Sequence, residues 1–162
     1  MRRVLFDTNA VDPLTDAHTY DVTRQAVEAG SLEVLYTHVT IDELAEIPDV
    51  DRRQQLLVLL VSIGRIVPTG STVVDYSRVE FCRVSSDESE APFEALRSNN
   101  LRHTKDALIA DTAVFEGCAL VTNERRLTNR ARARGIEVLT SAELVAQLVS
   151  RDCKRPQGGA VN

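Results

Sequence analysis

Short apolar segments alternate with helical patterns along almost the whole chain, and this order restricts the fold more than any other feature. Amphipathic or apolar patterns with helical spacing lie between the apolar segments and commonly end at glycine. The alternation predicts an α/β fold, a three-layer α/β/α sandwich with a mainly parallel central sheet of four to five strands. The expected strands are 3–6, 32–36, 65–67, 119–122 and 136–139, and the expected helices are 17–29, 40–47, 51–63, 105–116, 124–134 and 141–149.

The length and composition suit one domain of ordinary size. The chain has 162 residues, of which 43% are apolar, and it has no tryptophan, so we expect a core built of aliphatic side chains. We place this domain at 1–150, with an irregular insertion at 69–103. The polar segment 151–162 contains a proline and a glycine pair and is expected to be a disordered tail.

Charge, cysteine content and apolar runs exclude several classes of protein. A net charge of −5 argues against binding nucleic acid by bulk charge alone, although it does not exclude a nuclease. The 3 cysteines form no C-x-x-C pair, which argues against zinc and fits a reducing cytoplasm. No apolar run is long enough for a signal peptide or a membrane helix. We therefore expect a cytoplasmic protein with no membrane partner.

Four acidic residues occupy positions that a parallel sheet would bring together. Asp7 follows the first expected strand, and Glu124 follows the fourth. Glu43 and Asp106 are expected in the first turns of helices capped by Thr40 and Thr104. In open α/β sheets the site lies outside the carboxyl ends of the strands, where all of these carboxylates could converge.

Each of these acids has a purely structural explanation when it is taken alone. A carboxylate in the first turn of a helix is favoured by the helix dipole. The four together are harder to explain, because like charges that gather repel one another. Hard oxygen ligands of this kind suit Mg²⁺ or Mn²⁺, ions that lower the pKa of water and stabilise charge on a phosphodiester oxygen.

Several segments of the sequence resemble the successive motifs of PIN domains, in the same order and over roughly residues 3–149. A lone Asp-Thr-Asn is weak evidence, but four motifs in the expected strand and helix contexts are strong evidence. The segments are Phe6-Asp-Thr-Asn9, Glu43-Leu44, Asp106-Ala-Leu-Ile-Ala-Asp-Thr-Ala113 and Leu120-Val-Thr-Asn-Glu124.

The resemblance implies a PIN-like sandwich and a ribonuclease that depends on Mg²⁺ or Mn²⁺. Asp7, Glu43 and Asp106 match the core metal-binding acids of the family. Glu124 matches a fourth acidic position that is usually Asp, so we rank it below the other three as a ligand. The resemblance further implies that the side chains around the acids support them, namely Thr8, Asn9, Thr122 and Asn123.

Asp111 is a departure from the family pattern, because the helix usually has a small residue at that position. It lies five residues after Asp106 in the sequence, about 140° around an α-helix. We therefore expect a surface or supporting carboxylate rather than a metal ligand. A second departure is length, since the chain is longer than a compact toxin of this family.

Basic residues flank two of the acids and are candidates for binding RNA phosphates. We expect this role for Arg102 and Lys105, before Asp106, and for Arg125 and Arg126, after Glu124. The other basic residues of these two groups are Arg97, His103, Arg130, Arg132 and Arg134. Of these, Arg132 and Arg134 are better explained as a solvated face near a helix C-terminus.

Many PIN domains of this size resemble VapC-type toxins, which cleave RNA and are silenced by an antitoxin protein. The resemblance therefore implies an RNA substrate and an antitoxin partner. The helix expected at 51–63 is apolar around most of its circumference. One side could pack in the core and another against a second protomer, so we expect a homodimer.

Other functions are considered beside this one. A stand-alone RNA-processing nuclease would use the same fold and site. A non-catalytic PIN-fold binding module would be expected to have lost acidic residues, and its only support here is Glu124. A phosphatase of the haloacid-dehalogenase type would need a second Asp two residues after Asp7, where the sequence has Asn9. A receiver domain would need an acidic pair before Asp7 and a Lys after a late strand, and neither is present.

Overall fold

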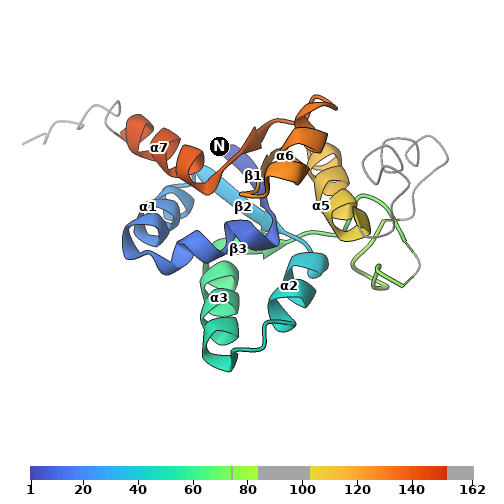
Figure 1. Ribbon diagram of the computed structural model, residues 1–162. Helices are drawn as coiled ribbons and strands as arrows, with labels where there is room; N and C mark the ends of the chain where they lie inside the picture. The colour runs from blue at the N-terminus through green and yellow to red at the C-terminus, as the bar shows by residue number, and fades with distance from the viewer. Residues whose placement is uncertain (74, 84–102, 153–162) are drawn as a thin grey trace, which may run out of the picture.

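Five parallel strands form one sheet in the order β3-β2-β1-β4-β5 (Figure 1). The structure is a computed structural model that describes residues 1–73, 75–83 and 103–152. Every neighbouring pair of strands is parallel, so the predicted α/β fold is confirmed. The strands are β1 (Arg2–Phe6), β2 (Leu32–Tyr36), β3 (Gly64–Ile66), β4 (Ala119–Val121) and β5 (Val138–Leu139).

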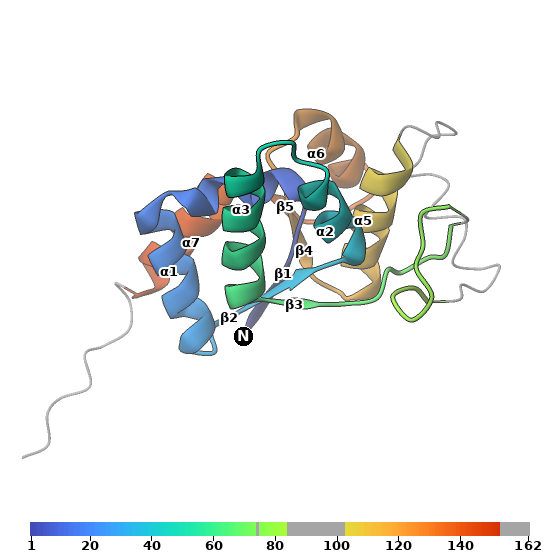
Figure 2. The ribbon, with the colours of Figure 1, turned by 90° about the horizontal axis from the view of Figure 1, so that it is seen from below.

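Alternate side chains of the central strand divide the core into two parts, one on each face of the sheet. Val4 and Phe6 pack in a cluster with residues of α1, α3 and α7. Leu5 lies between them and packs in a second cluster, with residues of α5 and α6. The predicted three-layer arrangement follows from this alternation (Figure 2). The helices are α1 (Ala17–Glu28), α3 (Val50–Ile63), α5 (Thr104–Phe115), α6 (Arg125–Arg132) and α7 (Ser141–Asp152).

Helix α2 (His38–Ala45) begins two residues earlier than the sequence pattern predicts. Thr37 has extended backbone angles directly after β2, and its side chain accepts a hydrogen bond from the Thr40 amide. The Thr40 hydroxyl donates to the carbonyl of Phe6 instead. The predicted cap at Thr40 is therefore wrong, and Glu43 lies in the second turn of the helix rather than the first.

Helix α5 also begins earlier than predicted. It starts at Thr104, and His103 stands at the capping position without a side-chain capping bond. Thr104 is buried within the first turn, so the prediction that it caps the helix is wrong. Asp106 does lie in the first turn, as predicted.

The described part of the segment after β3 is attached to α5. The amide of Gly70 donates to the Thr112 hydroxyl at 3.0 Å, and the Ser71 hydroxyl donates to Asp111 at 2.7 Å. A Cβ on Gly70 would lie 2.6 Å from Oδ2 of Asp111, so this close approach requires glycine. Residues 84–102 of the predicted insertion and residues 153–162 of the predicted tail lie outside the described residues.

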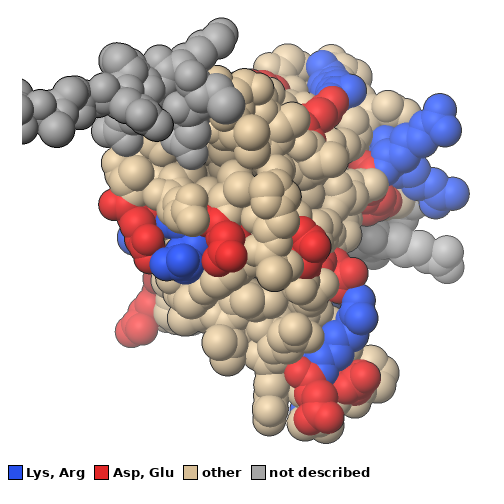
Figure 3. Space-filling view, turned by 90° about the vertical axis from the view of Figure 1, so that its left-hand side faces the viewer, with Lys and Arg blue, Asp and Glu red and all other residues tan. Residues whose placement is uncertain are grey.

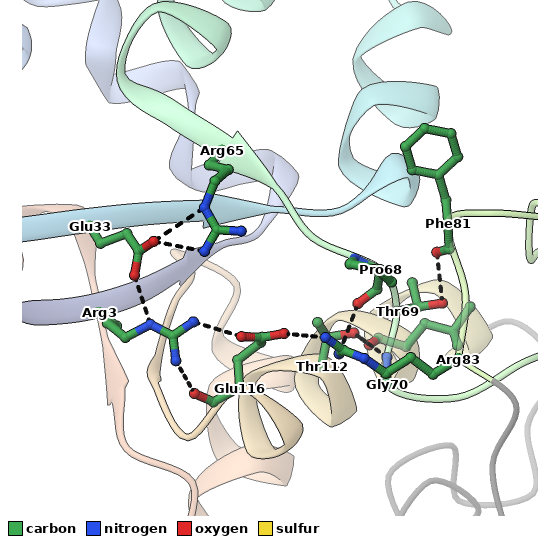
Figure 4. A network of polar contacts seen from close by, with 11 residues as sticks. Arg3, Glu33, Arg65, Pro68, Thr69, Gly70, Phe81, Arg83, Thr112 and Glu116 are labelled. Carbon is green, nitrogen blue, oxygen red and sulfur yellow. Dashed lines mark hydrogen bonds and ion pairs between the residues drawn. The ribbon is translucent and has the colours of Figure 1, made fainter.

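A chain of ion pairs joins this segment to the sheet (Figure 4). Arg3 of β1 contacts Glu33 of β2 at 2.7 Å and Glu116, at the end of α5, at 2.6 Å. Arg65 pairs with Glu33, and Arg83 pairs with Glu116 at 2.8 Å. Arg83 also lies 4.0 Å above the ring of Phe115. The network thus connects three strands, α5 and the segment after β3.

Helix α3 is buried on one side only. Leu56, Leu60 and Ile63 are buried in the core, whereas Val58 and Val61 are exposed. These two exposed valines lie among polar residues of the outer side, and the homodimer stays a prediction. Among the described residues, we find no helix with the length and apolar character needed to cross a membrane.

Candidate functional site

One open pocket of about 510 Å³ brings together all four predicted acids. Asp7, Glu43, Asp106 and Glu124 line it, together with Thr8 and Asn9. Asp7 follows β1, Glu43 lies on α2 and Asp106 on α5, and Glu124 precedes α6. The pocket therefore lies at the carboxyl end of the central strands, where the parallel topology places a site.

Asp7 is the buried centre of this pocket, with 3% of its surface exposed. Its Oδ1 accepts a hydrogen bond of 2.8 Å from the Thr8 amide. Its Oδ2 accepts hydrogen bonds of 2.7 Å from both the Asn9 side chain and the Thr122 hydroxyl. All of these donors are neutral, and among the described residues no cation contacts the carboxylate to balance its charge.

The environment of Asp7 raises its pKa from 3.8 to about 6. Burial is the main cause, because a charged carboxylate loses its hydration there. The hydrogen bonds from Thr122 and Thr8 oppose this effect, and the nearby charges of Asp106 and Glu43 add to it. Asp7 is thus a buried acid whose charged form needs a positive partner.

Glu43 lies between a hydroxyl and an ammonium group. The Thr8 hydroxyl donates a hydrogen bond to its Oε2. The Lys105 ammonium lies 3.6 Å from its Oε1 and 3.3 Å from Glu46. Lys105 was predicted to bind RNA, and in this structure it contacts Glu43 of α2 and Glu46 directly after that helix.

Asp106 is paired with an arginine that the sequence patterns did not single out. Arg130 Nη2 donates to Asp106 Oδ2 at 2.7 Å, and His103 Nδ1 lies 3.8 Å from the same oxygen. Arg130 is 24 residues further along the chain and on a different helix. Only the packing of α6 beside α5 brings the two together, so no local signal could have revealed the pair.

Glu124 stands at the capping position of α6, where its side chain makes no capping bond. Its amide donates to the Thr122 hydroxyl at 3.1 Å. Among the described residues, no side chain forms an ion pair or hydrogen bond with its carboxylate, which lines the pocket. Within the described part of the chain, its carboxylate is therefore available to a ligand.

The turn after β4 is joined to the turn after β1 by side chains predicted to support the acids. The Asn123 amide donates to Asn9 Oδ1 at 2.7 Å, and the Asn123 side chain donates to the Asn9 carbonyl at 3.1 Å. The Thr122 hydroxyl lies within 3.2 Å of Asn9 Oδ1 as well as close to Asp7. These bonds fix the relative position of the two turns that carry Asp7 and Glu124.

Asp111 lies apart from the residues that line this pocket. It is buried on α5 and accepts the hydrogen bond from Ser71. Burial raises its pKa, and the Ser71 bond partly opposes this. Of the two expected positions, surface or supporting, the surface one is therefore wrong, because the segment after β3 covers this side of the helix.

The remaining basic candidates differ in their surroundings. Arg125 and Arg126 are exposed in the first turn of α6, and neither forms an ion pair with the described part of the chain. Arg132 is exposed, as predicted. On the face over α1 and α7, acidic (red) and basic (blue) side chains form mixed groups around an uncharged centre (Figure 3). This face therefore has no continuous basic surface. Arg102 lies outside the described residues.

The residues of the pocket suit a hard cation in their chemistry. Carboxylate oxygens are the ligands that Mg²⁺ and Mn²⁺ prefer. Asp7 is a buried carboxylate with no counter-charge in contact with it in the described part of the chain. Within residues 1–73, 75–83 and 103–152, however, no three metal-binding side chains are gathered closely enough to form a ready-made metal centre. Asp106 and Glu43 instead contact Arg130 and Lys105.

Solved structures share this fold, whereas no protein-family model and no curated protein matches the sequence. VapBC2 from Rickettsia felis, bound to a DNA fragment from its promoter, matches with a TM-score of 0.55 at 16% identity, over 85% of this chain and 98% of that one. PAE2754 from Pyrobaculum aerophilum matches with a TM-score of 0.57 at 22% identity, over 92% of this chain and 98% of that one. VapBC-1 from nontypeable Haemophilus influenzae matches with a TM-score of 0.53 at 12% identity, over 86% of this chain and 98% of that one. The chain thus has a PIN-like α/β fold, as in VapC structures.

Proposed function

We propose that this protein is a metal-dependent endoribonuclease that hydrolyses phosphodiester bonds of RNA. The observation that carries the proposal is the single pocket lined by Asp7, Glu43, Asp106 and Glu124, which come from four different parts of the sequence. Folding stability does not account for this gathering, because it places like charges near one another and buries Asp7 with no cationic partner among the described residues. The motif resemblance and the PIN-like fold support the same function.

In this proposal, Asp7, Glu43 and Asp106 hold Mg²⁺ or Mn²⁺, and Glu124 has a weaker role. When bound, the ion supplies Lewis-acid chemistry, since it lowers the pKa of water and offsets charge on the phosphodiester. The protein supplies orientation. Asn9 and Thr122 direct Oδ2 of Asp7, and the Thr8 hydroxyl directs Oε2 of Glu43.

The RNA backbone would approach along the exposed start of α6. Arg125 and Arg126 directly follow the pocket residue Glu124 and have no acidic partner among the described residues. Their guanidinium groups are therefore free to bind phosphates, which position a nucleic acid without reading its sequence.

The likeness to VapBC structures suggests a biological setting, the toxin of a toxin–antitoxin pair. In that setting an antitoxin protein would bind and silence the enzyme, which would act in the cytoplasm, and a homodimer would form through the outer side of α3. A stand-alone RNA-processing nuclease is the alternative with the same site. A non-catalytic binding module is less well supported, since every predicted acid is present in the pocket.

An RNA cleavage assay with controlled metal content tests the proposal. Purified protein stripped with EDTA should leave labelled single-stranded RNA intact, and added Mn²⁺ or Mg²⁺ should restore cleavage. Cleavage that persists in EDTA would contradict the metal dependence. Binding of RNA without cleavage under every metal condition would favour the non-catalytic module.

A further inference from the structure

We propose that Arg130 and Lys105 are built-in counter-charges, and that they set the capacity of the acidic pocket at one divalent cation rather than two. This inference rests on the proposed function, because it concerns the metal that the nuclease would use. It goes beyond that function by assigning a role to two cations of this chain and by stating a stoichiometry.

Arg130 is held firmly against Asp106. Its side chain is only 17% exposed, and Nη2 lies 2.7 Å from Asp106 Oδ2. The Nε atom of Arg130 is buried and has no hydrogen-bond partner among the described residues. The guanidinium therefore satisfies only part of its hydrogen-bonding capacity, and its position is explained by the attraction of the acid.

Lys105 has the corresponding position beside Glu43. Its ammonium lies 3.6 Å from Glu43 and 3.3 Å from Glu46. The Lys105 side chain is 31% exposed, and its ammonium lies between these two carboxylates. Glu46 is 71% exposed and is not one of the residues that line the acidic pocket.

The other two carboxylates have no such partner. Asp7 accepts hydrogen bonds from neutral donors, and Glu124 forms no ion pair within the described residues. Asp12 also lines the pocket, but it pairs with Arg52 of α3. The four candidate carboxylates of the pocket are thus contacted by two cations. The net charge of this group is close to that needed to balance a single divalent ion.

A second ion would meet strong opposition in this arrangement. In two-metal sites the ions lie about 4 Å apart and share carboxylates between them. Here Asp106 Oδ2 and Glu43 Oε1 already face Arg130 and Lys105. A second ion would have to displace one of these cations or stand close to it, and each cation repels a divalent ion.

Calorimetric titration of Mn²⁺ into metal-free protein at about pH 8, where an ordinary histidine is neutral, tests the inference. The wild type should bind about one Mn²⁺ per chain. Arg130→Gln and Lys105→Gln should each bind Mn²⁺ about tenfold more tightly at low ionic strength, and the double variant should bind a second ion. Arg130→Lys keeps the charge and should stay near the wild-type affinity.

Arg132→Gln is the matched control, because it removes the same charge from the same helix. Arg132 contacts the Val138 carbonyl and lies 4.0 Å from Glu143, away from the pocket. Two ions in the wild type, or weaker Mn²⁺ binding in both Gln variants, would overturn the inference and leave the nuclease proposal standing. No Mn²⁺ binding by the folded wild type would instead count against the proposed function itself. If Arg130→Gln does not fold, Lys105→Gln still tests the inference, because the Lys105 side chain is partly exposed and its replacement should leave the fold intact.

Discussion

The Thr122 hydroxyl, just after β4, donates a hydrogen bond of 2.7 Å to the Asp7 carboxylate, just after β1. This bond favours the charged form of Asp7, against a burial effect that favours the neutral form. Because a bound cation also requires the charged form, Thr122 should affect metal binding without being a ligand.

Replacing Thr122 by Val should shift the pH dependence of Mn²⁺ binding. In the wild type the affinity should rise with pH up to about 6, the pKa of Asp7, and then level off. Without the hydroxyl, the pKa of Asp7 should move upward, and the pH at which the affinity levels off should move with it. Titrations between about pH 5 and 8 measure this. Thr23→Val is the control, because Thr23 is also buried and its hydroxyl donates to the Thr19 carbonyl within its own helix. An unchanged profile in Thr122→Val would contradict the assigned role.

Asp7→Asn should stabilise the metal-free protein above pH 6. The pKa of Asp7 is raised from 3.8 to about 6 on folding, so its contribution to stability is complete below 3.8 and is lost as the pH rises through about 6. The Asn variant has no charge to lose hydration and so avoids this loss. It does replace one carboxylate oxygen, an acceptor, by an amide NH₂ donor near the Asn9 side chain, which costs part of the gain. We expect a net gain of about 1–2 kcal/mol at pH 8.

Urea unfolding in EDTA at several pH values measures this gain, which should shrink as the pH falls toward 4. A variant less stable than the wild type at pH 8 would show that the hydrogen bonds to Asp7 outweigh its desolvation.

Much of the site could be predicted from sequence because Asp7 and Glu124 follow strands and Asp106 lies in the first turn of a helix. The position of Asp7 and Glu124 after apolar runs was enough to place both at one edge of a parallel sheet. The exact helix starts depend on tertiary contacts, since the Thr40 hydroxyl bonds Phe6, which is 34 residues away. The Arg130–Asp106 and Ser71–Asp111 contacts likewise join residues 24 and 40 positions apart, and no local pattern encodes them.

Glu124→Gln should reduce RNA cleavage less than Asp7→Asn does. Glu124 lines the pocket directly before α6, and its longer side chain is not fixed by any hydrogen bond to the described residues. We expect residual activity at about one tenth of the wild-type rate or more, against a loss of about a thousandfold for Asp7→Asn. Initial rates at saturating Mn²⁺ compare the two. Equal losses would make Glu124 a full ligand and refute this ranking.

Glu116→Gln should destabilise the protein without affecting the pocket. Burial alone would raise the pKa of Glu116, but hydrogen bonds from Arg83 and Arg3 outweigh it and lower the pKa. The charged form therefore contributes stability above the ordinary value of 4.5, and this contribution is lost as the pH falls through the lowered pKa. We expect a loss of about 1–2 kcal/mol at pH 7 that diminishes in acid. Thermal unfolding of the variant and of Glu28→Gln, in an exposed pair on α1, provides the comparison.

Cleavage of labelled single-stranded RNA by matched variants tests the central claim most directly. Asp7→Asn and Asp106→Asn each remove an acid of the pocket. Asp42→Asn is the control, because Asp42 lies on the same helix as Glu43 but is not a lining residue of the pocket and pairs with Arg78. With Mn²⁺ present and folding verified by circular dichroism, we predict that the first two variants lose cleavage and that Asp42→Asn retains it. Wild-type cleavage by folded Asp7→Asn would contradict the account, because a nuclease built around this pocket cannot work without its buried acid.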